Sequence, residues 1–244
     1  LHYVMEASAR NNIPLIVMDR PNPNAHYVDG PVLDLENQSF VGMHEVPIVY
    51  GLTIGEYATM INNEGWLNNN MKSKLTIIEL KNYNRKVTYD LPILPSPNLP
   101  NRKSINLYPS LCLFEGTNVS AGRGTEMQFQ IYGSPYLNKE KNNFRFTPKK
   151  NSGSKYPKHE NLLCYGKNLS ENKKLDKFDL SFLLNAYSDT NDKQNFFNNY
   201  FDKLAGTNSL KNQIISGLSE KKIIQSWKKK LDIYKEMRMK YLIY

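Results

Sequence analysis

The sequence predicts a mixed α/β protein, in which a parallel sheet is followed by a smaller and mainly helical region. Two observations lead to this prediction. Short apolar segments alternate with helical segments in the first third of the chain, which is the order of elements in βαβ units. Beyond residue 135 the apolar residues recur mainly at helical spacing. The sequence contains no evident internal repeat.

The first helix and strand are expected at the start of the chain. Apolar residues recur there at helical spacing, at Leu1, Val4, Met5 and Ala9. The two asparagines at 11–12 suit the end of this helix. Residues 13–18 (IPLIVM) then form a short apolar run, which is typical of a strand buried on both faces of a parallel sheet.

A second strand, helix and strand follow. Residues 47–50 have a strand-like pattern, and residues 75–80 have another. Between them Thr53 and Glu56 have the spacing of a capping box, so a helix is expected to begin there. Gly65 is the expected end of this helix. These segments extend the βαβ pattern.

The remainder of the chain reads as a smaller unit. Residues 92–100 form a proline-rich connection, 144–147 resemble a short strand, and 149–158 form a polar loop. Helices are expected at 178–186, at 194–204 and from about Ser219. The last helix has one apolar face, made of Ile223, Ile224, Trp227, Leu231, Tyr234 and Met237. The domain boundary is expected between 125 and 150, and we place it after residue 135, which gives domains 1–135 and 136–244.

The composition argues against two classes of function. No apolar run approaches the roughly 20 residues that cross a bilayer, so no membrane span is expected. The formal net charge is +9, but many lysines lie in Asn- and Lys-rich loops such as 138–143. Because no basic helix or aromatic strand motif accompanies this charge, we expect no nucleic-acid partner.

Several chemical motifs are missing from the sequence. His44 and Glu45 lack the second histidine of a zinc-binding helix, and no Gly-x-Ser-x-Gly nucleophile motif occurs. We therefore expect no metal ion and no cofactor. Cys112 and Cys164 are too few for a disulfide framework, and the sequence leaves open whether they form one bridge or two buried thiols.

The densest polar cluster is the loop 115–125 (EGTNVSAGRGT), which includes Glu115, Asn118 and Arg123. Its glycines permit close backbone approach, and the Arg123 fork suits a carboxylate or phosphate. The spacing of the glycines does not match a phosphate-binding P-loop. From the residues alone, a ligand-binding loop and a tight structural turn remain equally open.

A second polar cluster follows the first predicted strand. Ligands of open α/β sheets bind beyond the carboxyl ends of strands, where Asp19, Arg20, Asn22 and Asn24 are expected. Asn98 lies between proline-stiffened neighbours and is a further fixed amide. Carboxylates, amides and arginines of this kind recognise sugars. The alternative for Asp19 and Arg20 is a structural ion pair at the end of a strand.

Taken together, these segments resemble the NamZ-type exo-β-N-acetylmuramidase family. The likeness extends over nearly the whole chain. The matching segments are residues 1–7, 19–24, 28–31, 40–44, 51–56, 95–98, 114–118, 122–125, 163–166 and 226–227.

The resemblance implies a fold, an activity and a site. It implies an incomplete Rossmann-like parallel-sheet domain followed by a smaller α+β domain, with the active site in the cleft between them. The implied activity is hydrolysis that releases terminal, non-reducing N-acetylmuramic acid from peptidoglycan, in the periplasm or outside the cell. The lactyl carboxylate of this sugar is a target for Arg20 or Arg123. The expected catalytic residues are Glu115 and Asp19, and the expected substrate-binding residues are Arg20, Asn22, Asn24, Asn98, Asn118 and Arg123.

One feature of the family is not found in these residues. The family carries a Glu-His-Gly segment, which is its leading candidate for the catalytic acid, and this sequence contains no such tripeptide. Because the chain opens with Leu1 in a helical segment, we interpret it as an N-terminally truncated fragment. Two hypotheses follow: an exo-muramidase whose site is completed by upstream residues, or a glycan-binding or decayed protein without catalysis.

Overall fold

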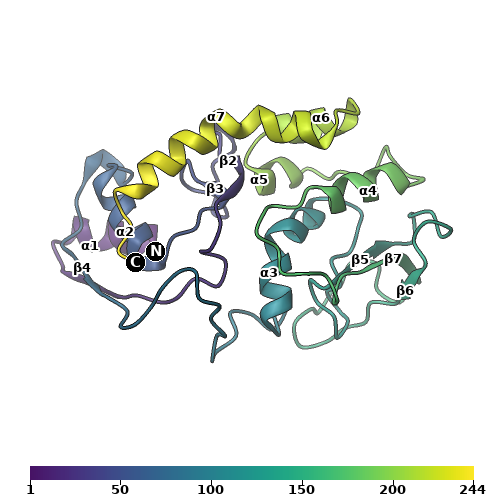
Figure 1. Ribbon diagram of the computed structural model, residues 1–244, viewed down its shortest axis with the longest axis horizontal. Coiled ribbons are helices and arrows are strands. Elements are labelled where there is room, and N and C mark those ends of the chain that lie inside the picture. Colours follow the sequence, from purple (N-terminus) through teal and green to yellow (C-terminus); the bar gives the residue numbers. More distant parts are fainter.

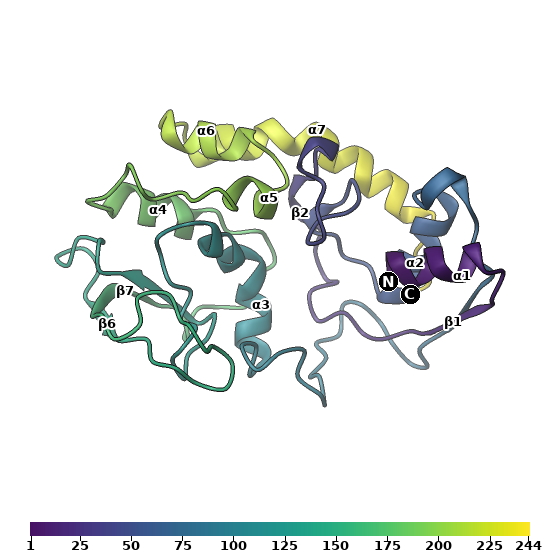
Figure 2. The ribbon, with the colours of Figure 1, turned by 180° about the vertical axis from the view of Figure 1, so that it is seen from behind.

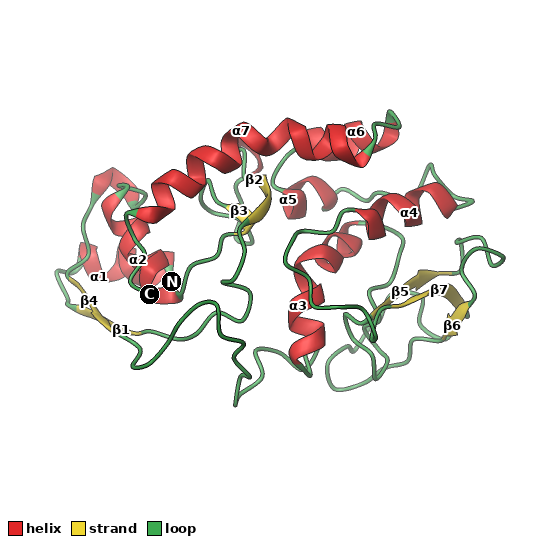
Figure 3. Ribbon diagram, in the orientation of Figure 1, coloured by secondary structure: helices red, strands yellow, loops and turns green.

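A parallel and an antiparallel sheet lie at opposite ends of the computed structural model, which describes residues 1–244 (Figure 1). The helices and strands are spread along the whole chain (Figure 3). In chain order they are α1 (His2–Arg10), β1 (Leu15–Met18), β2 (Asp29–Val32), η1 (Leu35–Asn37), β3 (Pro47–Val49), α2 (Ile54–Asn63), η2 (Asn68–Asn70), β4 (Leu75–Ile78), α3 (Arg102–Leu111), η3 (Cys112–Gly116), β5 (Ile131–Ser134), β6 (Phe144–Phe146), β7 (Cys164–Asn168), α4 (Ser181–Asp189), α5 (Phe201–Ala205), α6 (Ser209–Ile215) and α7 (Glu220–Met239).

The parallel sheet consists of β1 and β4, which pair from Leu15 opposite Leu75 to Met18 opposite Ile78. Helices α1 and α2 cover one face of this pair. The small core between them contains Met5, Val17, Ala58, Ile61 and Leu67. The prediction that β1 is buried on both faces is wrong, because the side chains of Ile16 and Met18 are 63% and 76% exposed on the other face.

The strand predicted at 47–50 is present as β3, but it does not join the parallel sheet. It pairs antiparallel with β2, a strand that the sequence pattern did not indicate. In β2 a glycine and a proline interrupt the apolar pattern, so its strand propensity is low. The β2–β3 hairpin packs under α7 near the middle of the molecule.

The second half is built around α3 and the antiparallel sheet β5–β7–β6. Helix α3 begins at a capping box in which Asn101 and Ser104 exchange hydrogen bonds. The helix expected at 194–204 is present only as α5. Residues 194–200 instead form turns, with a single bridge between Phe197 and Thr117 of the loop after η3.

The closing helix α7 joins the two halves. It runs across the molecule from α6 toward α1 and α2, as Figures 1 and 2 both show. The predicted apolar face is confirmed. Ile223, Trp227, Leu231 and Tyr234 are buried in the main core, which also contains residues of α3, η3 and α4. No helix in the structure is long and apolar enough to cross a membrane.

The capping box predicted at the start of α2 is also confirmed. The Thr53 hydroxyl accepts a hydrogen bond from the Glu56 amide (3.3 Å), and the Glu56 carboxylate accepts one from the Thr53 amide (2.9 Å). Gly65 has a positive φ of 71° one residue beyond the helix cap, as expected for a helix stop.

Both cysteines, Cys112 and Cys164, are free thiols.

Asp19 ties the end of β1 to the start of α2. Its Oδ1 accepts hydrogen bonds from the amides of Arg20 (2.9 Å) and Gly55 (2.8 Å). Its Oδ2 accepts them from the hydroxyls of Thr53 (2.7 Å) and Tyr244 (2.9 Å). A Cβ on Gly55 would lie 2.8 Å from the Asp19 carboxyl carbon, so this approach requires glycine.

A buried chain of hydrogen bonds links α1 to α2. His2 Nδ1 lies 2.9 Å from His44 Nε2, and His44 Nδ1 lies 2.7 Å from the Tyr57 hydroxyl. At the other end His2 Nε2 lies 3.3 Å from Glu6. Burial, together with the smaller effect of the charge of His2, lowers the pKa of His44 to about 4.

We predict that Asp19→Ala strongly destabilises the protein. The substitution leaves the buried Gly55 amide and Thr53 hydroxyl without their acceptor, and each orphaned buried group costs about 1–3 kcal/mol. A loss of about 3 kcal/mol in the free energy of unfolding is expected in urea denaturation. The control is Asp232→Ala on the exposed face of α7, and equal stability of the two variants would contradict this role for Asp19.

We predict that the protein loses stability between pH 6.5 and pH 4 because of His44. The unfolded chain takes up this proton near pH 6.5, whereas the folded protein does so only near pH 4. The stabilisation is fully present above pH 6.5 and falls by up to about 3 kcal/mol as the pH drops to 4. Urea unfolding at pH 7 and pH 4.5 measures it. A His44→Gln variant with the same pH dependence as the parent would refute the assignment.

Candidate functional site

The loop that follows η3 is folded by glycines. Gly122 and Gly124 have φ of 79° and 81°, in the left-handed region that favours glycine. A Cβ on Gly124 would lie 2.5 Å from Cβ of Pro157, so the loop lies directly against the polar segment that contains Pro157. Arg123, between the two glycines, is thereby directed toward Glu115.

Glu115 and Arg123 form an ion pair in a cavity of about 200 Å³. Arg123 Nη1 donates to Glu115 Oε1 at 2.9 Å, and the two side chains are 40% and 34% exposed. Arg123 Nε is buried and has no partner. We call this space the Arg123 cavity; its lining is Glu115, Val119, Ser120, Ala121, Arg123, Ser154, Tyr156 and Lys158.

Lys158 holds the loop after η3 in place through its ammonium group. Its ammonium group donates to three backbone carbonyls, those of Phe114 (2.8 Å), Thr117 and Val119 (3.1 Å). Burial lowers the pKa of Lys158 to about 8, while the charge of Glu115 opposes this shift. Lys158 is therefore still charged at pH 7. With two cations and one carboxylate, the Arg123 cavity has an excess positive charge and favours an anionic ligand.

Two asparagines predicted to bind substrate, Asn98 beside this loop and Asn118 within it, have unused hydrogen-bonding atoms. Asn98 donates to the carbonyl of Gly153 at 2.6 Å, one residue before Ser154 in the cavity lining, and its Oδ1 is buried without a partner. Both polar side-chain atoms of Asn118 are also buried without a partner. Because buried polar atoms in proteins are almost always satisfied, such groups indicate a place where water or a ligand binds.

The remaining predicted residues lie elsewhere, at the carboxyl end of β1. All the acceptor positions of Asp19 are used by its four donors, as described above. Asn22 donates to the carbonyl of Leu52 (2.8 Å) and accepts from the amide of Asn24 (2.9 Å). Asn24 donates to the carbonyl of Ile105 (2.9 Å). The side chain of Arg20 is exposed. These contacts give the cluster a structural role, and its participation in a site stays a prediction.

The structure thus brings Glu115 and Arg123 into contact. Asn118 belongs to the same loop and Asn98 bonds to Gly153 next to Ser154, but neither asparagine lines the cavity. It does not bring Asp19, Arg20 or Asn22 into the same cavity. Asn24 lines a different cavity of about 270 Å³ with the cationic residues Arg102, Lys103 and Lys174.

Sequence reasoning missed the residues that complete the Arg123 cavity. Ser154, Tyr156 and Lys158 come from a segment that the sequence shows only as a polar loop. Nothing in that segment's composition indicates a buried lysine. The only signal was the set of glycines in the loop 115–125, which indicated close backbone approach but not the partner segment.

Two family models cover nearly the whole chain. The N-terminal model of exo-beta-N-acetylmuramidase NamZ matches residues 1–103, and the C-terminal model matches residues 106–244. The models meet near residue 104, whereas the sequence placed a boundary after residue 135. The location of the domain boundary stays a prediction.

The chain is also similar to known proteins. It is 37% identical over 268 residues to the peptidoglycan beta-N-acetylmuramidase NamZ of Bacillus subtilis (strain 168). That alignment covers 99% of this chain and 62% of the relative, so the chain spans less than two thirds of the relative's length.

Two crystal structures of DUF1343 family proteins from Bacteroides fragilis NCTC 9343 have the same fold. One is 44% identical with a TM-score of 0.94 and covers 99% of this chain and 69% of that protein. The other is 24% identical with a TM-score of 0.81 and covers 98% and 68%. These likenesses confirm the predicted mixed α/β fold. Because the two family models together span the chain, and the C-terminal model alone matches more than half of it, this protein belongs to the exo-beta-N-acetylmuramidase NamZ family.

Proposed function

We propose that this protein is a peptidoglycan glycoside hydrolase that releases terminal, non-reducing N-acetylmuramic acid, with the Arg123 cavity as the binding site for that sugar. The observation that carries the proposal is the excess positive charge of this cavity in a member of the NamZ family. N-acetylmuramic acid differs from N-acetylglucosamine by a lactyl carboxylate. The guanidinium group of Arg123, whose side chain is 40% exposed, is suited to bind this carboxylate.

Glu115 is the carboxylate that we assign to the reaction. Glycoside hydrolysis uses a proton donor at the leaving oxygen and a second carboxylate that acts on the sugar or on a water. Arg123 occupies Oε1 of Glu115 and leaves Oε2 free to accept a hydrogen bond from water or to face the sugar ring. Because its partner is a cation, Glu115 suits the second role. No other carboxyl group lines the cavity, so the proton donor in this proposal is a group outside that lining.

The substrate also suggests where the protein acts. Peptidoglycan lies outside the cytoplasmic membrane, so we propose that the protein works in the periplasm or as a secreted protein. We propose no nucleic-acid partner, because the positive charge of the site is concentrated in a small cavity with a single ion pair.

A second candidate function is glycan binding without catalysis. It is favoured by the single carboxylate in the Arg123 cavity and by the cavity's volume of about 200 Å³, which lies below the ~300–1,000 Å³ typical of small-molecule sites. Both functions use the same residues for recognition, so they are distinguished by product release and not by affinity.

We predict that the protein releases N-acetylmuramic acid from the disaccharide MurNAc-GlcNAc. Chromatography of the products over time measures the release, and Glu115→Gln is expected to lower the rate at least about 100-fold because it removes the charge that acts at the sugar. Binding of the disaccharide without any release would refute the hydrolase and favour the glycan-binding function. Absence of both from a correctly folded protein would refute the two together.

We predict that Arg123→Gln selectively weakens binding of N-acetylmuramic acid. Loss of a charge-assisted hydrogen bond to the lactyl carboxylate is expected to lower the affinity about tenfold or more, as measured by calorimetry. Affinity for N-acetylglucosamine, which lacks the carboxylate, should not change. Arg145→Gln on the exposed face of β6 is the matched control. If both arginine variants bind N-acetylmuramic acid like the parent, the Arg123 cavity is not the carboxylate site.

A further inference from the structure

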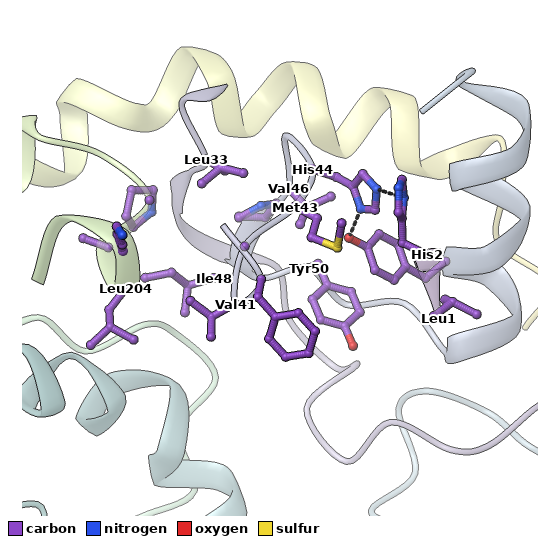
Figure 4. Close-up of a pocket in the computed structure, with 18 of the residues that line it drawn as sticks. Leu1, His2, Leu33, Val41, Met43, His44, Val46, Ile48, Tyr50 and Leu204 are labelled. Carbon is purple, nitrogen blue, oxygen red and sulfur yellow. Dashed lines mark hydrogen bonds between the residues drawn. The ribbon is translucent and has the colours of Figure 1, made fainter. Parts of the chain in front are cut away.

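A larger cavity lies on the other side of α5 from the Arg123 cavity. It has a volume of about 340 Å³, within the range of small-molecule sites. Its walls come from the β2–β3 hairpin and its connecting loop, from the start of α1 and α2, and from the end of α5. We call it the hairpin pocket; Figure 4 shows the side chains that line it, among them Val41, Met43, His44, Tyr50 and Leu204.

The hairpin pocket differs in chemistry from the Arg123 cavity. Twelve of its 19 lining residues are hydrophobic, and Lys203 is the only lysine, arginine or carboxylate side chain among them. Phe40, at its rim, is 79% exposed and stacks on Tyr3. Tyr50 and Tyr57 stack on each other at its base, with ring centroids 5.2 Å apart. Aromatic faces and aliphatic walls with few charges suit a neutral ligand that has both apolar and polar groups.

The hairpin pocket also contains a polar group, the Tyr57 hydroxyl, whose hydrogen bond to His44 fixes its orientation. With His44 neutral, one consistent arrangement has the Tyr57 hydroxyl donating to His44 Nδ1 and His44 Nε2 donating to His2 Nδ1. His2 Nε2 then donates to Glu6. In this arrangement the Tyr57 oxygen keeps its lone pairs free. The pocket therefore presents a hydrogen-bond acceptor, fixed by a buried chain, next to aliphatic side chains. An acetamido group, with an N–H and a methyl, matches both features.

The two cavities are joined by α5. Its first residue, Phe201, lies against Gly116, where a Cβ would be 2.6 Å from the Phe201 Cα, and Asn198 donates to the carbonyl of Glu115 at 3.2 Å. Its last residues and Gly206 line the hairpin pocket. Five helical residues span only about 8 Å. The segment that leads into α5 thus packs beside Glu115 of the Arg123 cavity, and the end of α5 lines the hairpin pocket.

Exposed aromatic residues lie beside α5 on the Glu115 side. Tyr200 immediately precedes the helix and is 41% exposed, and Tyr108 of α3 is 40% exposed. Burial raises the pKa of the Tyr108 hydroxyl to about 12; the charge of Glu115 adds to this shift and that of Arg123 opposes it. A sugar that leaves the Arg123 cavity toward α5 would therefore meet aromatic surface before it reaches the hairpin pocket.

We propose that the hairpin pocket is a second sugar-binding site, which holds a neutral N-acetylhexosamine farther along the glycan strand whose terminal N-acetylmuramic acid occupies the Arg123 cavity. The proposal rests on the proposed function for the identity of the strand. The two sites differ in charge: the cationic cavity takes the sugar with a carboxylate, and the mainly apolar pocket takes a sugar without one.

The test compares three probes on the 244-residue chain: N-acetylmuramic acid, N,N′-diacetylchitobiose, and a MurNAc-GlcNAc tetrasaccharide. Two variants address the pocket. Phe40→Ala removes an exposed aromatic ring, and Tyr57→Phe removes the acceptor oxygen. Ile233→Ala, at an exposed apolar residue of α7, is the matched control, and thermal unfolding verifies that each variant is folded.

The expected result has two parts. The tetrasaccharide binds the parent at least about tenfold more tightly than N-acetylmuramic acid, and each pocket variant lowers tetrasaccharide and chitobiose affinity about fivefold, the effect of one neutral hydrogen bond or aromatic contact. Neither variant changes the affinity for N-acetylmuramic acid. Equal affinity of the parent for the tetrasaccharide and the monosaccharide, or pocket variants that bind chitobiose like the parent, overturns the second site.

The two proposals fail in different ways. In one outcome the parent binds chitobiose, the pocket variants do not, and N-acetylmuramic acid does not bind. The proposed function is then refuted, and the hairpin pocket stands as a site for neutral N-acetylhexosamines. In the other outcome the parent binds N-acetylmuramic acid, the Arg123→Gln variant does not, and chitobiose does not bind. The hairpin pocket is then refuted as a sugar site, and the proposed function stands.

Discussion

The buried carboxylate of Asp19 is the interaction on which the first half of the structure depends. A buried carboxylate is costly unless hydrogen bonds replace its hydration, and here four donors do so. They come from the end of β1, from the start of α2 and from Tyr244 beyond α7. The carboxylate therefore fixes the angle at which α2 leaves the sheet. Because Thr53 serves both Asp19 and the capping box, the same contacts hold the β3–α2 connection and, through it, the walls of the hairpin pocket.

The second half depends on a different buried charge. Lys158 binds three carbonyls of the loop after η3, which a neutral side chain could not satisfy together. This converts a glycine-rich loop, which would otherwise have many conformations, into a fixed frame for Glu115 and Arg123. Helix α5 packs against this loop. Phe201 lies so close to Gly116 that residue 116 cannot carry a side chain. The same short segment therefore carries the residues proposed to bind the sugar and packs against α5.

These two halves meet along α5 and α7, and this arrangement gives the proposed sites their relation to each other. The segment before α5 packs beside the cationic cavity, and the end of α5 lines a mainly apolar, partly aromatic pocket. A polymer of alternating acidic and neutral amino sugars has matching chemistry along its length. Helix α7 packs across the β2–β3 hairpin and into the core of the second half, so the distance between the two sites is set by a continuous apolar interface and not by a flexible linker.

The sequence by itself determined the local features of this protein. It predicted the mixed α/β fold, the α2 capping box and the α7 apolar face, because each of these depends on residues close together in the chain or on a regular period. It could not give the exposure of β1, the pairing of β3 with β2, or the shortness of α5, since these depend on which surfaces meet. Only the tertiary structure decided that Lys158 and Tyr156 complete the Arg123 cavity while Asp19 serves the fold, because desolvation and hydrogen-bond partners are fixed by neighbours that are distant in sequence.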